Sequence, residues 1–285
     1  MSDKKRALVT GGSSGMGKET AIALAKQGYE VIVLCRNSAR GELALQDIKR
    51  KSGSKAVYLA VCDLGNLESI RGFAADFKNN YDSLQVLVNN AGVILPKRHE
   101  TRDGYEQQFG VNHLGHFLLT NLLADLLMKS APARVVVVSS GAHKAGKLHF
   151  EDIHLKKGYS TFKAYSQSKL ANVLFAYELA DRLKGSGVTV NCLHPGAAAT
   201  QIGINRETGF GSFATSLLKL FFQTPEKGAA TAVYLASSPE VAGETGQYYY
   251  KKKPAQSSKS SHDKKLADRL WSLSEELVGI EVPMI

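Results

Sequence analysis

Cysteine, proline and long apolar runs are scarce in this chain of 285 residues. The three cysteines, Cys35, Cys62 and Cys192, lie far apart and form no CxxC pair, so we expect neither a disulfide framework nor a zinc cluster. The densest apolar stretches, such as residues 135–138 and 217–222, are far shorter than the roughly 20 residues of a membrane span. The polar first residues lead directly into a strand-like segment, so no signal peptide is expected. These absences predict a cytoplasmic protein without an integral membrane segment.

Acidic residues are also few, because 26 Asp and Glu face 36 Lys and Arg and leave a formal net charge of +10. Part of the excess lies in residues 251–270, where bases clearly outnumber acids. Such a run could bind nucleic acid or an anionic membrane surface. No nucleic-acid motif accompanies it, so we expect a solvated linker leading into a surface helix and no nucleic-acid partner. Peripheral contact with a membrane is left open.

Short apolar segments alternate with longer segments of helical periodicity. The expected strands are 6–10, 30–35, 56–61, 84–88, 133–139, 187–193 and 246–250, and the main expected helices are 16–27, 70–77, 105–129, 165–184, 225–236 and 263–278. The unbroken apolar segment 30–35 is typical of a parallel strand covered on both faces. The alternation predicts a single α/β domain over residues 1–250, a Rossmann-type, doubly wound, mostly parallel sheet of about seven strands with helices on both faces. Residues 251–285 would form a basic linker and a C-terminal helical extension.

A glycine-rich turn, TGGSSGMG at residues 10–17, joins the first expected strand to the first helix. Glycines there permit a tight turn and let a diphosphate approach free amides at a helix N-terminus. The position favours a nucleotide site over a plain strand–helix turn. The candidate cofactor-binding residues of this turn are Gly11, Ser13, Ser14, Gly15, Met16 and Gly17.

The second strand ends at Arg36 and Asn37, where a carboxylate would bind a ribose that carries free hydroxyls. No carboxylate is present. Arg36, with Arg40 one turn later, can instead pair with a 2′-phosphate through a guanidinium fork. The predicted cofactor is therefore NADP(H) rather than NAD(H), and the alternative is that Arg36 is a solvated loop residue.

Two further strand ends carry candidate cofactor contacts. Asp63, after the third strand, could hydrogen-bond the adenine amino group or cap the next helix. The fourth strand ends in the small residues Asn90, Ala91 and Gly92, which permit the backbone to pass close to a ribose.

The candidate reacting groups follow the fifth strand. Ser140 ends that strand, and Tyr165 and Lys169 share one helix face because they lie at positions i and i+4. A nearby ammonium favours phenolate and lowers the tyrosine pKa from about 10. Tyr165 could then exchange a proton near neutral pH. A YxxxK pair alone is common by chance, but the nucleotide turn and the serine strengthen it.

Seven pieces of the chain, in family order, resemble the short-chain dehydrogenase/reductase family. They are TGGSSGMG (10–17), CDL (62–64), NNAG (89–92), Asn112 in VNHLGHF, Ser140, YSQSK (165–169) and HPG (194–196). Segments 139–143, 164–180, 224–240 and 266–278 resemble its retinol dehydrogenase-like branch.

The resemblance implies a role for each matching residue. Tyr165 would be the general acid in reduction and the general base in oxidation, while Lys169 would lower its pKa and bind the nicotinamide ribose. Ser140 would hydrogen-bond the substrate oxygen, and Asn112 would hold a water in the proton relay. The remaining residues expected beside the cofactor are Leu64, Pro195, Gly196, Ala198 and Thr200. Residues 197–225 would form a substrate lid, apolar on one helical face over 212–223.

The chain departs from the family pattern at several points. The segment from Ser140 to Tyr165 is about a dozen residues longer than the matching segment in many members. Three alanines at 197–199 stand where bulkier residues are expected before Thr200. Met16 stands where isoleucine is usual. The membrane-anchoring N-terminal helix of many retinol dehydrogenases is not expected here, which weakens a retinoid assignment.

Two other groups of residues have simpler interpretations. His113, His116, His143, His149 and His154 have no spacing suited to a metal, so no metal site is expected, although His143 could line the substrate mouth. The three tyrosines at 248–250 would alternate across a strand and serve packing or a subunit contact.

The sequence thus predicts an NADP(H)-dependent oxidoreductase that interconverts a carbonyl and an alcohol on a hydrophobic substrate, such as an aldehyde, retinoid, steroid or lipid-derived ketone. Reduction of a carbon–carbon double bond, as in protochlorophyllide reductases, is an alternative. A non-catalytic NADP(H)-binding sensor or scaffold is another. The resemblance also implies a homodimer or homotetramer through the helix that carries Tyr165.

Overall fold

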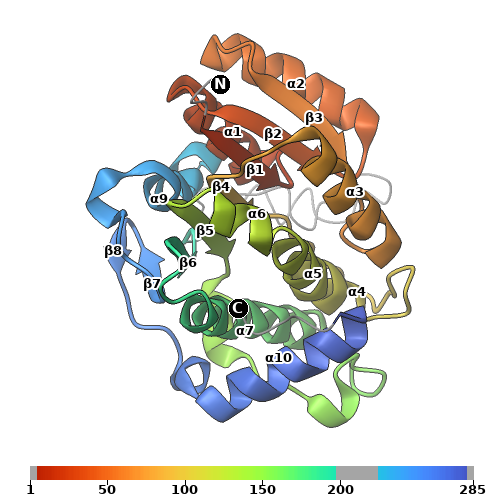
Figure 1. Cartoon of the computed structure of the whole chain (residues 1–285). Coiled ribbons are helices and arrows are strands. Elements are labelled where there is room, and N and C mark those ends of the chain that lie inside the picture. Colours follow the sequence, from red (N-terminus) through yellow and green to blue (C-terminus); the bar gives the residue numbers. More distant parts are fainter. Residues whose placement is uncertain (1–4, 197–223, 281–285) are drawn as a thin grey trace.

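The computed structural model describes residues 5–196 and 224–280. Its strands form one sheet in the order β3-β2-β1-β4-β5-β6-β7-β8 (Figure 1). Neighbouring strands from β3 to β7 pair in parallel, and β8 pairs antiparallel with β7. The strands are β1 (Arg6–Thr10), β2 (Glu30–Cys35), β3 (Val57–Val61), β4 (Val86–Asn89), β5 (Ala133–Val138), β6 (Val188–Leu193), β7 (Gln247–Tyr250) and β8 (Lys253–Pro254). The predicted mostly parallel α/β sheet is confirmed.

Helices cover both faces of the sheet (Figure 1). They are α1 (Gly15–Lys26), α2 (Ser38–Ser52), α3 (Leu67–Asn80), α4 (Gln107–Phe109), α5 (Gly115–Leu122), α6 (Ala124–Lys129), α7 (Thr161–Arg182), α9 (Pro225–Ser237) and α10 (Lys264–Val278). Helix α7 begins four residues before its predicted start because the Ser160 side chain accepts a hydrogen bond from the Lys163 amide. Tyr165 therefore lies within the helix rather than at its first position.

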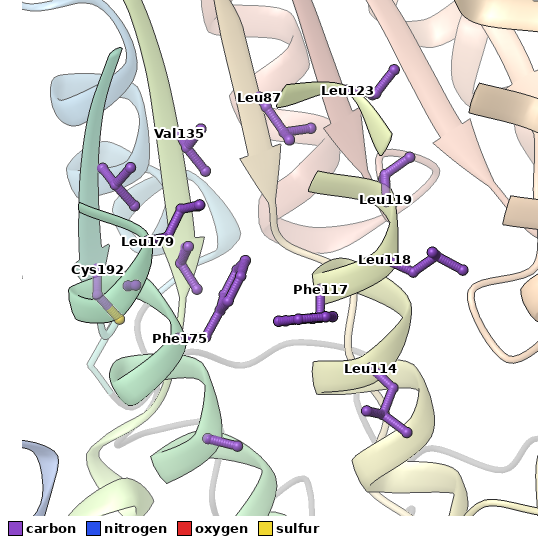
Figure 2. Close-up of a cluster of buried hydrophobic side chains, with 14 of the residues drawn as sticks. Leu87, Leu114, Phe117, Leu118, Leu119, Leu123, Val135, Phe175, Leu179 and Cys192 are labelled. Carbon is purple, nitrogen blue, oxygen red and sulfur yellow. The ribbon is translucent and has the colours of Figure 1, made fainter. Parts of the chain in front are cut away.

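Two apolar layers form the core, one on each face of the sheet. Along β1, Ala7 and Val9 pack in one layer and Leu8 in the other, as the two-residue repeat of a strand requires. Tyr248 and Tyr249 are divided in the same way, which confirms their predicted alternation. Figure 2 shows part of the layer between α5, α7 and the central strands.

The prediction of one continuous helix over 105–129 is wrong, because the structure divides this range into several shorter pieces. The Glu106 carboxylate accepts hydrogen bonds from the Gln108 and Phe109 amides, so α4 begins only at residue 107. A π-helical turn at Gly110–Leu114 then separates α4 from α5, and Leu123 separates α5 from α6. Apolar periodicity runs through all of these pieces, so the sequence gives no sign of the breaks.

The segment expected as a solvated linker after residue 250 is mostly exposed, as predicted, but it is folded. Residues 253–254 form β8, a 3₁₀ turn follows at Lys259–His262, and the Ser261 side chain is buried. The predicted final helix is confirmed as α10, which Asp263 caps by accepting a hydrogen bond from the Leu266 amide. Contacts with residues far along the chain organise this segment although its sequence is rich in lysine.

Helix α10 lies along α7 and covers its outer face (Figure 1). Trp271, 2% exposed, packs edge-on against Phe117 with ring centroids 4.9 Å apart and stacks on Phe175 at 5.9 Å. The Arg182 guanidinium lies 4.2 Å from the centre of the Trp271 ring, and Glu178 pairs with both Arg182 and Lys264. The homodimer or homotetramer that the resemblance implies through the helix of Tyr165 stays a prediction, and it would have to use a part of α7 that α10 leaves free.

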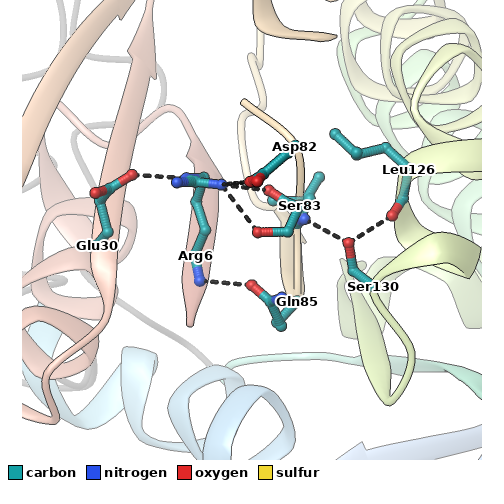
Figure 3. Close-up of polar contacts among 8 residues, drawn as sticks. Arg6, Glu30, Asp82, Ser83, Gln85, Leu126 and Ser130 are labelled. Atoms are coloured by element: carbon teal, nitrogen blue, oxygen red, sulfur yellow. Dashed lines mark hydrogen bonds and ion pairs between the residues drawn. The ribbon is translucent and has the colours of Figure 1, made fainter. Parts of the chain in front are cut away.

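Polar contacts join the elements at the amino end of the sheet (Figure 3). The Arg6 guanidinium donates to Glu30 Oε1 at 2.6 Å and to the Ser83 carbonyl at 2.9 Å. Ser130 Oγ accepts a hydrogen bond from the Leu84 amide at 2.8 Å. These bonds tie β1, β2 and the segment before β4 together and leave the carboxyl end of the sheet for the candidate site.

Within the two described ranges, no helix has the length and apolarity that a membrane crossing would need.

Replacing Trp271 by alanine tests the packing of α10. We expect the free energy of unfolding to fall by about 3–5 kcal/mol, because a fully buried aromatic side chain and its stacking partners are lost. Leu43→Ala is the control, since Leu43 is 70% exposed on α2 and should change the value by less than about 0.5 kcal/mol. Urea unfolding of the three proteins gives the comparison. Equal values for the two variants would contradict the packing described.

Candidate active site

The turns after β1 and β4 are bonded to each other at the carboxyl edge of the sheet. Thr10 Oγ1 accepts hydrogen bonds from the Asn90 amide at 2.8 Å and the Ala91 amide at 2.9 Å. The Asn90 side-chain amide donates to the Thr10 carbonyl at 2.7 Å. These three hydrogen bonds hold the glycine-rich turn against the NNAG segment. Two groups of predicted cofactor-binding residues therefore lie side by side.

Each glycine of the turn is required, or tolerated, for a different steric reason. Gly11 has φ +65°, and a Cβ there would lie 2.9 Å from Ala91 Cα. A Cβ on Gly17 would collide with the Asn90 side chain and the Gly11 carbonyl. Gly15, by contrast, has φ +54° and no neighbour within 4 Å of its Cβ position, so the turn is open on that side. Open space at the first residue of α1 is what a diphosphate would need to reach the helix amides.

Met16 and the two serines complete the turn. Met16 is buried in the apolar layer with α1, in agreement with its expected packing role. Ser14 is the N-cap residue of α1, but its side chain makes no capping hydrogen bond. The Ser13 side chain lies near the Cys35 thiol, whose pKa burial raises. Their contacts with a cofactor stay predictions.

The residues after β2 are exposed. Asn37 caps α2, because its side-chain oxygen accepts a hydrogen bond from the Arg40 amide at 2.9 Å. The guanidinium groups of Arg36 and Arg40 form no ion pair with any residue in 5–196 or 224–280. Both charges are thus available to an anion at this end of the sheet, as the prediction of a 2′-phosphate requires.

One alternative for Asp63 is wrong. Asn66, not Asp63, caps α3 by accepting from the Glu68 and Ser69 amides. The Asp63 carboxylate instead accepts from the Gly65 amide at 2.9 Å and stabilises the turn before the helix. Its contact with adenine stays a prediction. The Leu64 side chain is buried in the core, so only its backbone could face a cofactor.

Asn112 lies in the π-helical turn and is completely buried. Its Oδ1 accepts from the Val93 amide at 2.7 Å, and its Nδ2 donates to the Val93 carbonyl at 3.1 Å and to Ser168 Oγ at 3.0 Å. These bonds connect it to the segment after Gly92 and to the helix of Tyr165. The structure therefore brings three sequence-distant candidates together.

Lys169 projects inward from α7. It is 4% exposed, and its Nζ donates to the Val138 carbonyl at 3.2 Å. A Cβ on Gly92 would lie 3.5 Å from Lys169 Nζ and 3.4 Å from Asn112 Oδ1, so Gly92 is where the backbone passes close to both polar groups. The Lys169 Nζ is also 5.6 Å from the centre of the Tyr165 ring.

The pKa of Tyr165 differs from the prediction. Burial raises it above the usual value of 10, and the neighbouring Ser140 side chain acts in the opposite direction. Burial also lowers the pKa of Lys169 to about 8. We expected Lys169 to lower the pKa of Tyr165, but burial is the largest influence on the pKa of each group, because desolvation penalises each charged form.

Three histidines of the candidate cluster are buried and contact residues inside the protein. His116 Nε2 lies 2.9 Å from Thr10 Oγ1, and its Nδ1 lies 3.0 Å from the Asn112 carbonyl. His113 is buried beside Ser274 of α10. His143 is a completely buried loop residue and does not line an open substrate mouth. Among the described residues, no group of His, Cys, Asp and Glu side chains is placed to hold a metal ion.

The loop after β6 is described only in part. Pro195 and Gly196 are described, and Gly196 has φ +82°. Ala198, Thr200 and the lid segment 212–223 lie outside the described residues.

Sequence reasoning missed several groups that hold the candidates in place. Thr10 joins the two cofactor turns, Ser139 Oγ donates to the Lys169 carbonyl at 2.7 Å, and Asn172 Nδ2 donates to the Val138 carbonyl at 3.3 Å. Asn172 lies three residues after Lys169 on a helix, which was a visible sign that it shares the same face. The roles of Thr10 and Ser139 depend on contacts between distant segments.

A glycine-rich turn after the first strand, with a half-buried tyrosine and a buried lysine on one helix face at the same edge of the sheet, is typical of a nucleotide-dependent oxidoreductase with a doubly wound sheet. A model of the short chain dehydrogenase family matches residues 5–209. The chain belongs to this family. Its relatives include human retinol dehydrogenase 13, 44% identical over 99% of this chain and 86% of that protein. Human retinol dehydrogenase 14 is 43% identical over 97% of this chain and 87% of that protein.

Solved structures share the fold. An uncharacterised protein from Mycobacterium Paratuberculosis has a TM-score of 0.78 and 34% identity, and the match covers 98% of this chain and 95% of that chain. A short chain dehydrogenase from Shigella flexneri, complexed with NADP, has a TM-score of 0.68 and 25% identity, with 87% of this chain and 97% of that chain covered. The chain is thus a short-chain dehydrogenase family oxidoreductase related to retinol dehydrogenases.

Lys169→Met tests the buried ammonium. Burial lowers the Lys169 pKa from 10.5 to about 8, so between these pH values the unfolded chain binds more protons than the folded protein. The free energy of unfolding of the wild-type protein, taken relative to Lys169→Met, should therefore rise by about 3 kcal/mol over this range, at about 1.4 kcal/mol per pKa unit. Urea unfolding at both ends of the range measures it. A difference that is constant or falls with pH would contradict the buried position of Lys169 Nζ.

Proposed function

We propose that this protein interconverts a carbonyl and an alcohol on a hydrophobic substrate with NADP(H) as cofactor. The observation that carries the proposal is the convergence of Asn112, Tyr165 and Lys169 beside Gly92 at the carboxyl edge of the sheet. Ser140 belongs to the same group because its side chain lies close enough to the Tyr165 phenol to affect its pKa. Membership of a family of nucleotide-dependent dehydrogenases supports the reaction type.

The protein residues would supply the proton and the orientation. Tyr165 Oη would donate a proton to the carbonyl oxygen in reduction and accept it in oxidation, while Ser140 Oγ would hold that oxygen by a hydrogen bond. A neutral, half-buried phenol is suited to the donor role, since burial keeps its pKa above the usual value.

The residues present fit a dinucleotide. The turn is open at Gly15, the amides of α1 begin there, and the exposed guanidinium groups of Arg36 and Arg40 follow the adjacent strand. These residues would hold the phosphates, and Asn90, Gly92 and Lys169 would lie along the nicotinamide half. The bound cofactor would supply the hydride.

Two observations favour an apolar substrate. Phe162 is 60% exposed and lies three residues before Tyr165 on α7, on the same side of the helix. An exposed aromatic ring close to the reacting group suits an apolar ligand. The named relatives are retinol dehydrogenases, so retinoids join aldehydes, steroids and lipid-derived ketones as candidates for this chain.

Tyr165→Phe tests the chemistry. A panel of hydrophobic aldehydes and ketones, including retinal, is first assayed with NADPH by absorbance at the nicotinamide wavelength. With a substrate so found, we expect turnover to fall on the order of 10³-fold or more, since the group that would transfer the proton is removed. NADPH binding, followed by fluorescence, should stay within about threefold because the ring is retained. Turnover close to that of the wild-type protein would contradict the assigned role.

Arg36→Ala tests the cofactor preference. The wild-type protein should bind NADPH more tightly than NADH, and the variant should lose on the order of 10-fold or more in NADPH affinity with little change for NADH, because a charged hydrogen bond contributes about 1.5–3 kcal/mol. Lys26→Ala, on the last turn of α1, is a control of equal charge change. Equal loss for both nucleotides, or no loss, would show that Arg36 does not bind a 2′-phosphate.

A further inference from the structure

The His143 side chain is completely buried and joins the Ser140 turn to the C-terminal extension. Its Nδ1 lies 2.6 Å from the Ser140 carbonyl oxygen, and its Nε2 accepts a hydrogen bond from the Ser258 amide at 3.1 Å. Ser258 is 115 residues further along the chain. The imidazole thus forms a direct bridge between the loop after β5 and the segment 251–262.

The two partners determine the tautomer of the ring. A backbone amide can only donate, so Nε2 must be unprotonated. A carbonyl oxygen can only accept, so Nδ1 must carry the proton. His143 is therefore neutral with the proton on Nδ1, and burial lowers its pKa below the ordinary value, which agrees with this form.

The bridge continues into the loop after β6. Tyr248 Oη lies 2.8 Å from His194 Nδ1 and 3.3 Å from His143 Nδ1. Because the His143 Nδ1 proton is donated to the Ser140 carbonyl, Tyr248 Oη is only a neighbour of that nitrogen, and its hydroxyl proton is free for His194 Nδ1. His194 stacks on Tyr250 with ring centroids 4.2 Å apart and directly precedes Pro195. The hydrogen bonds thus link the loops after β5 and β6, β7 and the extension.

The segment that supplies the Ser258 amide is itself fixed to α7. Ser257 Oγ lies 2.8 Å from Tyr177 Oη and 2.9 Å from His262 Nε2, and the His262 ring stacks on Tyr177. Ser261 Oγ donates to Ser257 Oγ at 2.7 Å. Since Tyr177 and Tyr165 belong to one helix, the same rigid element carries the proton donor and the support for Ser258.

The orientation of the Ser140 hydroxyl depends on this turn. Ser140 Oγ accepts from the Ala142 amide at 3.2 Å, and the Ser140 carbonyl accepts from the His143 amide at 3.0 Å as well as from the imidazole. A rotation of the peptide that carries the Ser140 carbonyl would break the two bonds to that oxygen. Closure of the turn by the His143 side chain therefore limits the positions available to Ser140 Oγ.

We propose that His143 is a positioning residue for Ser140, and that the extension sets its tautomer through the Ser258 amide, so that the 251–262 segment supports the active site. This inference rests on the proposed function, because Ser140 is given its part in the reaction there. His143 does not touch the reacting atoms, and it acts through the Ser140 backbone.

Ring NMR tests the hydrogen bonds without any substrate. In the wild-type protein with ¹⁵N-labelled histidine at pH 7, long-range proton–nitrogen correlations should show His143 as the Nδ1-protonated neutral form, which is the minor tautomer in water. Ser258→Ala keeps the amide and should leave these signals unchanged. The Nε2-protonated form, or a charged ring, would overturn the proposal.

Turnover of two matched variants shows which of the two hydrogen bonds of His143, to Ser140 or to Ser258, matters for the reaction. His143→Asn can still donate to the Ser140 carbonyl, whereas His143→Gln can accept from the Ser258 amide but offers no donor at Ser140. We expect kcat to fall on the order of 10- to 100-fold in His143→Gln with KM within about twofold, because a displaced polar group weakens the reacting state more than substrate binding. His143→Asn should retain kcat within about threefold. Equal losses in both would contradict the assignment.

A double-mutant cycle with Ser140→Ala separates positioning from general destabilisation. If His143 acts through Ser140, His143→Gln should change the residual turnover of Ser140→Ala by less than about twofold. Full additivity of the two losses would overturn the proposal. Absence of carbonyl turnover in the wild-type protein would instead contradict the proposed function, and the NMR tautomer would still decide whether the bridge exists.

Discussion

Parallel alignment of β1 to β7 is the constraint from which the arrangement of the site follows. Because these strands run in one direction, their carboxyl ends share one edge of the sheet, and the order β3-β2-β1-β4-β5-β6-β7 places the segments after them side by side. Thr10 then bonds directly to Asn90 and Ala91, although 80 residues separate Thr10 from Asn90. The register in turn depends on near-continuous apolar strands such as β2, which both core layers bury.

Within that frame, three buried polar side chains of the candidate site are held by hydrogen bonds to the backbone. Lys169 donates to the Val138 carbonyl, Asn112 makes two bonds with Val93, and His143 bridges Ser140 and Ser258. Burial of these groups costs desolvation energy, and hydrogen bonds to fixed backbone offset part of that cost. The result is a site whose donors have little freedom before a ligand arrives, which is the condition under which such groups stabilise a reacting state effectively.

The sequence was a good guide to strands and a poorer one to the connections between helices. Every predicted strand from 6–10 to 246–250 agrees with the structure to within two residues, because apolar runs bounded by turn residues are local signals. The breaks around Gly110–Leu114 and the packing of 251–262 could not be predicted, since each depends on contacts with distant segments. The cap at Asn66 is a local contact, but the sequence offered Asp63 as a cap just as readily. Spacing placed Tyr165 and Lys169 on one helix face, but it could not show that burial raises the pKa of Tyr165. That direction follows from α7 lying inside the molecule.

The central claim is that this protein moves a hydride between NADP(H) and a carbonyl carbon. Its most direct test is to follow deuterium from labelled NADPH into the product. NADPH that carries deuterium at the transferable position of the nicotinamide would be mixed with the protein and a hydrophobic aldehyde, and the alcohol formed would be examined by mass spectrometry and NMR. The account predicts one deuterium on the former carbonyl carbon for each NADPH consumed. Alcohol without deuterium, or consumption of NADPH with deuterium on a carbon of a reduced double bond, would contradict it.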